Sequence, residues 1–218
     1  MLLFTNFVPF IAISAMATVP IFFYQWRAAD GSALTPWIKI GLSLVLSAVC
    51  QAMILYATFQ ALRGRPVHIG ESMAQGLRRA APVFVASLVS GLITVLGFIL
   101  LIVPGLIALT MFYVTEPACV VERLGPLDSI GRSIDLTRGY RWPIFGAVFV
   151  VGLIDTVVSF ILAMMLAHPE TLLLYSVIIY AWSTLSRSYQ SVLVAIIYHD
   201  LRVVKEGIDL EHIAAVFD

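Results

Sequence analysis

Charged residues are scarce in this chain. Only 12% of its 218 residues are Asp, Glu, Lys or Arg, whereas an average soluble domain carries about a quarter. Hydrophobic residues make up 61% of the sequence, and the mean hydropathy is +0.98. A water-soluble fold of this length could not bury so much apolar surface, so the composition excludes a soluble domain. It indicates a single integral membrane domain over residues 1–218.

Cysteine is also rare, and the common catalytic motifs are missing. The two cysteines, Cys50 and Cys119, lie inside apolar runs, so neither a disulfide framework nor a C-x-x-C metal or redox motif is expected. The sequence has no H-E-x-x-H zinc motif, no G-x-S-x-G nucleophile elbow, no G-x-x-x-x-G-K-[ST] phosphate loop and no dinucleotide-binding fingerprint. We therefore predict a protein without enzymatic activity, catalytic residues, metal ligands or cofactors. Its expected partner is the lipid bilayer and not nucleic acid.

The sequence is rich in long apolar runs. A helix needs roughly 20 residues to cross a hydrocarbon core of about 30 Å, and five apolar blocks reach that length. The third block, 83–121, is long enough for two crossings, and Val103-Pro104-Gly105 offers the proline and glycine of a tight turn within it. One kinked, steeply tilted helix is the alternative, and Pro117 is expected to disturb the second crossing. We expect an all-α polytopic transmembrane helical bundle of about six spans, at residues 2–24, 38–62, 83–102, 106–121, 143–166 and 172–198, followed by a tail over 199–218.

Basic residues gather on one side of the predicted spans. If the block 83–121 forms a hairpin, the segments before and after it share a side with the C-terminal tail, and all of these segments are basic. The opposite side offers only Arg27, in the first loop. By the positive-inside rule we predict a multi-pass protein of the bacterial cytoplasmic (inner) membrane with both termini in the cytoplasm. The basic residues on this side are Arg63, Arg65, Arg78, Arg79, Arg123, Arg132, Arg138, Arg141, Arg202 and Lys205.

Two of these basic segments have the apolar periodicity of cytoplasmic interfacial helices. In the segment 69–80, Ile69, Met73 and Leu77 recur at helical spacing, opposite a polar and charged face. We expect this amphipathic helix to lie along the membrane surface before the next span begins.

The segment 127–138 repeats this plan. Leu127, Ile130 and Ile134 form its apolar side, and charged residues form the other side. On the charged side Asp128 precedes Arg132 by four residues, which is the spacing of a favourable ion pair within a helix. A second interfacial amphipathic helix is therefore expected.

Several short motifs occur in order along the chain. They are Ile102–Leu106 (IVPGL), Thr115–Ala118 (TEPA), Leu127–Arg138 (LDSIGRSIDLTR) with Gly139 and Trp142, and Tyr198–Arg202 (YHDLR) with Glu206–Asp209. Together they resemble the bacterial membrane-domain family found fused to glycerophosphoryl diester phosphodiesterases. The resemblance covers about residues 60–215 and implies a helical membrane fold and a membrane location. It implies no phosphodiesterase activity, because the carboxylate metal site and paired histidines of the catalytic barrel have no counterpart in this chain.

Four polar residues within the predicted spans form the candidate binding cluster: Glu116, Asp155, Arg187 and Gln190. A charge at mid-depth costs about 2.5–3.5 kcal/mol on insertion scales, so such residues are usually paired or functional. Asp155 and Arg187 reach similar depth and are candidates for an ion pair. They either pin two helices together, or line a path for a solute, proton or peptide, or have no contact. Polar residues surround the helix over 183–191, so this stretch is expected to face protein or a wet cavity.

Two classes of function agree with these observations. The first is a non-enzymatic scaffold or accessory subunit in envelope or lipid-related processes, with a membrane-protein partner or a second copy of the chain. The second is a small-solute or ion transporter or channel with a polar path near Asp155 and Arg187. The interrupted fourth span and the polar belt around Arg187 argue for this second class. The sequence alone favours the first class, because it shows no catalytic chemistry and few charges inside the membrane.

Overall fold

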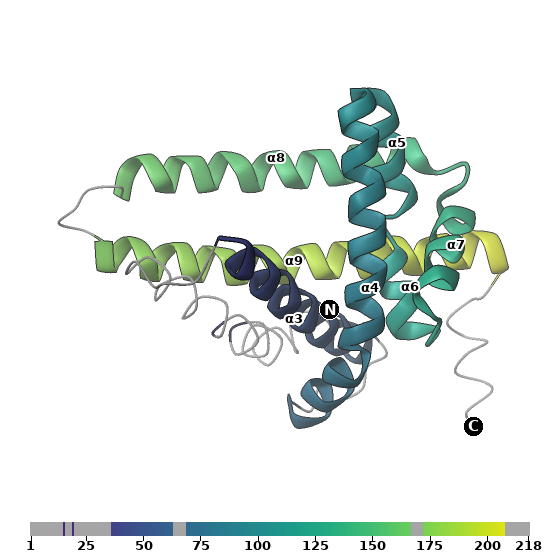
Figure 1. Ribbon diagram of the computed structural model, residues 1–218, viewed down its shortest axis with the longest axis horizontal. Helices are drawn as coiled ribbons and strands as arrows, with labels where there is room; N and C mark the ends of the chain where they lie inside the picture. Colours follow the sequence, from purple (N-terminus) through teal and green to yellow (C-terminus); the bar gives the residue numbers. More distant parts are fainter. Residues whose placement is uncertain (1–14, 16–18, 20–35, 63–68, 167–171, 208–218) are drawn as a thin grey trace.

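The computed structural model describes residues 15, 19, 36–62, 69–166 and 172–207, and Figure 1 shows their arrangement. Within these residues the chain is helical and contains no strand, which confirms the all-α fold class. The elements are α3 (Pro36–Leu62), α4 (Ile69–Leu100), α5 (Ile102–Met111), α6 (Thr115–Val121), α7 (Pro126–Thr137), α8 (Arg141–Leu166) and α9 (Leu172–Glu206).

Four helical segments in the described ranges are long and apolar enough to cross a membrane, so the chain is a membrane protein by the length and composition of its helices. Apart from residues 15 and 19, the predicted span 2–24 lies outside the described residues. The predicted span 172–198 falls within α9, which is long enough but interrupted by polar side chains around Arg187. The total of six spans stays a prediction. The four segments are Gly41–Gln60, Ala74–Leu100, Ile102–Val121 and Arg141–Met165.

The third apolar block folds back on itself, so the alternative of one kinked helix is wrong. The reversal comes earlier than predicted, at Leu101, whose extended backbone (φ −165°, ψ 155°) separates α4 from α5. Pro104 lies in the first turn of α5, where a proline removes no helical hydrogen bond. Gly105 does not form the turn. It allows α5 to pack closely against α4, since a Cβ at this position would lie 2.4 Å from the ring of Phe98 on α4.

The predicted span 106–121 is two helices. α5 ends at Met111, and α6 begins after a short non-helical stretch. Pro117 does not cause the break, because it lies in the first turn of α6, where proline is tolerated. The break leaves the Met111 carbonyl without a helical partner, and Ser133 Oγ of α7 donates a hydrogen bond to it at 2.7 Å. The interruption is therefore stabilised by α7.

The face of α7 that packs inward differs from the predicted one. Leu127 was expected on the apolar side but is 73% exposed. Ile130 is buried as expected, yet beside it lie the buried hydroxyl residues Ser129, Ser133 and Thr137. These small side chains let α7 approach its neighbours closely, and their hydroxyls donate to backbone carbonyls within reach. Whether α7 also lies on a membrane surface stays a prediction.

α3 lies at the centre of the packing. Its residues Ala52 and Leu55 are 0% exposed and pack with Val83 of α4, Cys119 of α6 and Val194 of α9. Burial of these apolar side chains holds the four helices together.

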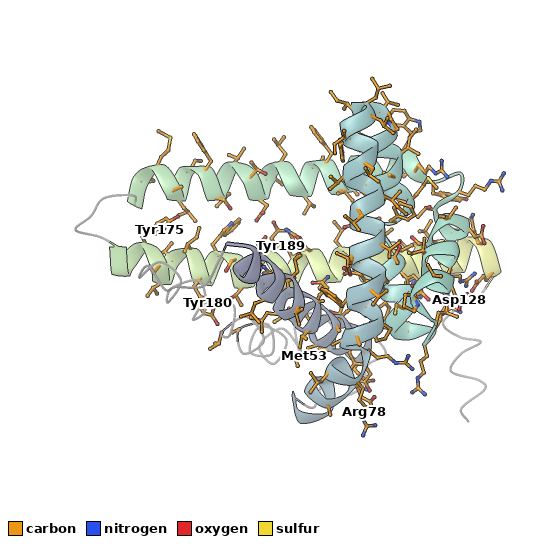
Figure 2. All side chains as sticks on the ribbon, in the orientation of Figure 1. Met53, Arg78, Asp128, Tyr175, Tyr180 and Tyr189 are labelled. Carbon is orange, nitrogen blue, oxygen red and sulfur yellow. The ribbon has the colours of Figure 1, made fainter. Side chains whose placement is uncertain are left out.

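A close approach of α3 and α4 at Gly76 predicts a strong effect of substitution. Gly76→Ala is expected to destabilise the protein by about 1–3 kcal/mol, the usual cost of overpacking. The reason is that a Cβ there would lie 2.6 Å from the Cα of Met53, which Figure 2 shows on α3. The control is Gly70→Ala in the same helix, where a Cβ meets nothing within 4 Å. Unfolding in mixed micelles by added dodecyl sulfate, followed by circular dichroism, measures both, and equal midpoints would contradict the close approach.

The hairpin of α8 and α9 lies crosswise to α4 and α5 (Figure 1). Two hairpins that cross cannot both follow one membrane normal, so the arrangement differs from the bundle of near-parallel spans expected from the sequence. The most apolar part of α8 contains no buried residue. Phe149, Leu153 and Phe160 are 55%, 51% and 63% exposed. α8 therefore offers its apolar side chains to lipid or to another membrane helix.

Candidate functional site

The polar stretch of α9 is turned into the protein. Thr184, Ser186, Ser188 and Ser191 are all buried. Ser191 Oγ and Thr58 Oγ1 of α3 lie 3.1 Å apart in a hydrogen bond between the two helices. The expectation that this stretch does not face lipid is confirmed for these side chains.

Asp155, in the middle of α8, is held by hydroxyl groups of α9. Ser186 Oγ donates a hydrogen bond to Asp155 Oδ1 at 2.5 Å, and Tyr189 OH donates to the same oxygen at 3.3 Å. Tyr189 is labelled on α9 in Figure 2. Gln190 Nε2 donates to Ser186 Oγ at 3.0 Å and completes a chain of hydrogen bonds to the carboxylate. Among the described residues, Asp155 is thus stabilised by neutral donors.

Asp155 and Arg187 were candidates for an ion pair. Within the described residues, no ion pair joins these two side chains. The reason is the helical position of Arg187. Ser186, Tyr189 and Gln190 lie on one face of α9 at the i, i+3 and i+4 positions, whereas Arg187 is displaced from Ser186 by about 100° around the axis. Arg187 and Asp155 instead line the same cleft.

Glu116 lies in the first turn of α6, directly after the break. Ser87 Oγ of α4 is 2.9 Å from Glu116 Oε1 and 2.8 Å from the Val83 carbonyl oxygen. A hydroxyl has one proton, so Ser87 can donate to only one of these oxygens at a time. Gln51 of α3 lines the same cleft as Glu116, so this carboxyl lies where α3, α4 and α6 meet.

Two clefts meet at Arg187 and Gln51, because both side chains line both clefts. The first cleft, of about 470 Å³, also contains Glu116. The second, of about 480 Å³, also contains Asp155 and Gln190. The structure thus brings the four candidate residues to two adjoining clefts. Gln51 was not predicted as part of the site, although an isolated amide in an apolar span is a signal of this kind.

The groups that line these clefts are suited to binding a polar ligand. They include one guanidinium, two carboxyl groups and several amide and hydroxyl groups. Across the described ranges, no group of three or more His, Cys, Asp or Glu residues could hold a metal ion. Such an arrangement can orient a small polar or charged molecule by hydrogen bonds.

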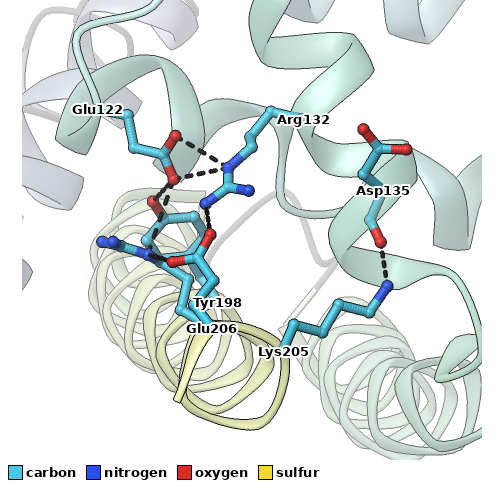
Figure 3. A network of polar contacts seen from close by, with 7 residues as sticks. Glu122, Arg132, Asp135, Tyr198, Lys205 and Glu206 are labelled. Atoms are coloured by element: carbon cyan, nitrogen blue, oxygen red, sulfur yellow. Dashed lines mark hydrogen bonds and ion pairs between the residues drawn. The ribbon is translucent and has the colours of Figure 1, made fainter. Parts of the chain in front are cut away.

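A second polar network, drawn in Figure 3, ties the C-terminal ends of α6 and α9 to the middle of α7. Glu122 accepts a hydrogen bond from Arg132 Nε at 2.9 Å and another from Tyr198 OH at 2.5 Å. Arg132 also pairs with Glu206, which accepts a further bond from Arg202 Nε at 2.9 Å. Three helices are thus linked through two carboxylates.

The predicted helical pair between Asp128 and Arg132 is wrong. Arg132 contacts Glu122 and Glu206 instead, and both of these residues lie outside α7. The spacing of charges along a single helix cannot reveal such partners. Beside this network, Lys205 of α9 donates to the backbone carbonyl oxygen of Asp135 on α7 (Figure 3).

The network predicts a loss of stability in acid. Partial burial by itself raises the pKa of Glu206, but hydrogen bonds from Arg132 and Arg202 and their charges outweigh it and hold this pKa below its ordinary value of 4.5. A carboxylate with a depressed pKa contributes stability that is complete above its unfolded-state pKa. The free energy of unfolding should therefore fall as the pH drops below 4.5 and through the lower pKa of the folded state. Denaturant titrations at a series of pH values measure this slope. The slope should be shallower in Glu206→Gln, and identical slopes would contradict the role of Glu206.

One family model matches the chain. Residues 67–201, more than half of its length, match the model described as Domain of unknown function (DUF7847). No curated protein matches the chain, and no solved structure matches it. Nothing in these comparisons links it to the membrane domains of glycerophosphoryl diester phosphodiesterases, so that resemblance stays a prediction. The matched range includes all four candidate residues of the binding cluster.

Proposed function

We propose a function for this chain, which belongs to the DUF7847 family of domains of unknown function: it binds a small anionic or zwitterionic solute within the membrane and passes it across. The observation that supports this most is the sharing of Arg187 and Gln51 between two clefts, with Glu116 in one and Asp155 in the other. In this proposal the protein has no enzymatic activity. It lies in the bacterial cytoplasmic membrane with about six spans and both termini in the cytoplasm.

Arg187 is the residue on which the proposal rests. Its guanidinium has no ionic partner in the part of the chain that the structure describes. An arginine at mid-membrane costs about 2.5–3.5 kcal/mol on insertion scales, and such residues usually mark a substrate or ion path. Its planar donors match a carboxylate or phosphate group in two parallel hydrogen bonds. A bound anion would therefore supply the missing counter-charge.

The two carboxyl groups explain how a solute could have two positions. Asp155 and Glu116 each already accept hydrogen bonds from serine hydroxyls, which can turn toward a bound ligand. An amino group of a zwitterionic solute would find a carboxylate in either cleft, while its acid group stays near Arg187. Movement between the clefts would then keep one contact throughout, which lowers the barrier between the two positions.

Uptake into liposomes tests this proposal. Purified protein is reconstituted, and influx of labelled amino acids, small carboxylates and inorganic phosphate is compared with that of protein-free liposomes. Influx of at least one solute above the protein-free level is expected, with a loss of about tenfold or more in Arg187→Ala. The control is Arg78→Ala, which removes the same charge from an exposed position of α4. No influx of any of these solutes, with the protein shown to be folded, would overturn the proposal.

A scaffold or accessory subunit is the second candidate function, because α8 exposes apolar side chains along its most apolar part. A second copy of the chain or another membrane protein could cover this face. Leu153→Cys tests for a second copy, since Leu153 is exposed and both native cysteines are buried. A disulfide-linked dimer formed in native membranes would support the scaffold, and an exclusively monomeric band would count against a second copy on this face.

A further inference from the structure

A third cavity, separate from the two clefts at Arg187, lies where α5, α7 and α8 meet. Its volume is about 710 Å³. Leu106 and Ile107 of α5 line one side with apolar surface, and Phe145 of α8 adds an aromatic ring. Arg138 and Arg141, which flank the turn between α7 and α8, line it as well. The cavity is thus apolar on one side and cationic on the other.

In the part of the chain that the structure describes, the two arginines of this cavity form no ion pair. Arg141 Nε is buried and has no hydrogen-bond partner among the described residues, and a buried donor left unpaired is destabilising. Arg138 likewise forms no ion pair within the described ranges. Asp135 also lines the cavity but pairs with neither arginine, so the lining keeps an excess of positive charge. These groups are arranged to receive an anion.

The depth of the cavity is that of a lipid headgroup. Arg141 and Trp142 begin the candidate membrane span Arg141–Met165. Trp142 is 82% exposed and packs edge-on against Phe145, with ring centroids 6.1 Å apart. Tryptophan and arginine at the end of a span are typical of the membrane–water interface.

We propose that this cavity binds an anionic phospholipid. The phosphate lies between the guanidinium groups of Arg138 and Arg141, where charge-assisted hydrogen bonds satisfy the unpaired Nε. An acyl chain follows the apolar surface of Leu106, Ile107 and Phe145 into the membrane. Basic pockets between membrane helices are a known setting for acidic headgroups. This site is independent of the solute clefts, since the two share no lining residue.

Thermal unfolding in detergent with added lipid tests the proposal. The protein in dodecyl maltoside receives increasing dioleoyl phosphatidylglycerol or dioleoyl phosphatidylcholine, and the shift in melting temperature gives an apparent affinity. Wild-type protein is expected to bind phosphatidylglycerol at least about tenfold more tightly than phosphatidylcholine. Arg138→Ala, at an exposed position, is expected to lose several-fold of this preference, and Arg138→Ala with Arg141→Met is expected to lose all of it. Arg78→Ala is expected to retain the preference for phosphatidylglycerol, because Arg78 lies near the end of α4 that is farther from α5 (Figure 2).

The measurements also separate a lipid site from a phosphate site. Arg141→Met without added lipid should melt no lower than the wild type, because it removes an unpaired buried donor. Water-soluble glycerol 1-phosphate should cause no shift at concentrations where phosphatidylglycerol saturates. Equal affinity for the two phospholipids, a preserved preference in the double variant, or binding of glycerol 1-phosphate as tight as that of the lipid would each overturn the proposal.

Discussion

Replacing Arg187 with leucine is expected to raise the free energy of unfolding by about 2 kcal/mol while abolishing solute uptake. Insertion scales assign an arginine at mid-depth a cost of about 2.5–3.5 kcal/mol and assign leucine a small gain. The structure shows no ionic partner for Arg187 among its described residues, so leucine removes a charge without leaving another charge unpaired. The expected gain is smaller than the full insertion cost because Arg187 lines two clefts that water can enter.

Unfolding by dodecyl sulfate and uptake into liposomes are measured on the same preparations of this variant. Arg187→Lys, which keeps the charge but not the planar fork of donors, is expected to retain the stability of the wild type and lose most of the uptake. Arg78→Leu, at an exposed site, should change stability by less than about 0.5 kcal/mol. A lower stability of Arg187→Leu would show that Arg187 holds the fold together, and would remove the main support for the transport proposal.

Glu122→Ala is expected to destabilise the protein by about 2–3 kcal/mol. The substitution leaves the hydroxyl of Tyr198 without its acceptor, and Tyr198 is only 1% exposed. It also removes one of the two carboxylates that bind Arg132. The ion pair itself contributes less than a fully buried one, because its side chains are 27% and 18% exposed. Most of the loss is therefore assigned to the unsatisfied tyrosine.

A double-mutant cycle with Tyr198→Phe isolates this contribution. In the Tyr198→Phe background the buried hydroxyl is gone, so Glu122→Ala should cost only about 1 kcal/mol there. Denaturant unfolding of the four proteins measures the coupling. Arg123→Ala is the control, since this neighbouring arginine is exposed and takes no part in the ion pairs within the described ranges. Equal costs in both backgrounds would contradict the assignment to Tyr198.

Several features of the fold could be predicted from the sequence. Apolar runs long enough to cross a membrane are a local property, and four of the predicted spans coincide with apolar helices. The reversal within the block 83–121 was predicted because a helix of that length exceeds the membrane. Its position at Leu101 was not predicted, since proline is accepted in the first turn of the following helix and so does not mark where the chain turns.

The residues of the candidate site could also be predicted from the sequence, but their hydrogen-bond partners could not. Glu116, Asp155, Arg187 and Gln190 stood out because polar groups are costly in an apolar layer. Their partners depend on how each helix is rotated about its axis. A shift of one residue turns a side chain by about 100°, which is why Ser186 and not Arg187 reaches Asp155.

The sequence by itself determined that this protein resides in a membrane, that it is helical, and which polar residues must be sheltered from lipid, because these follow from the transfer of single side chains between water and hydrocarbon. Only the tertiary structure decided the crosswise packing of the hairpins, the meeting of two clefts at Arg187, and the network around Glu122. These features depend on contacts between residues far apart in the chain. In such contacts helix rotation and close packing choose among partners that have the same hydropathy and charge.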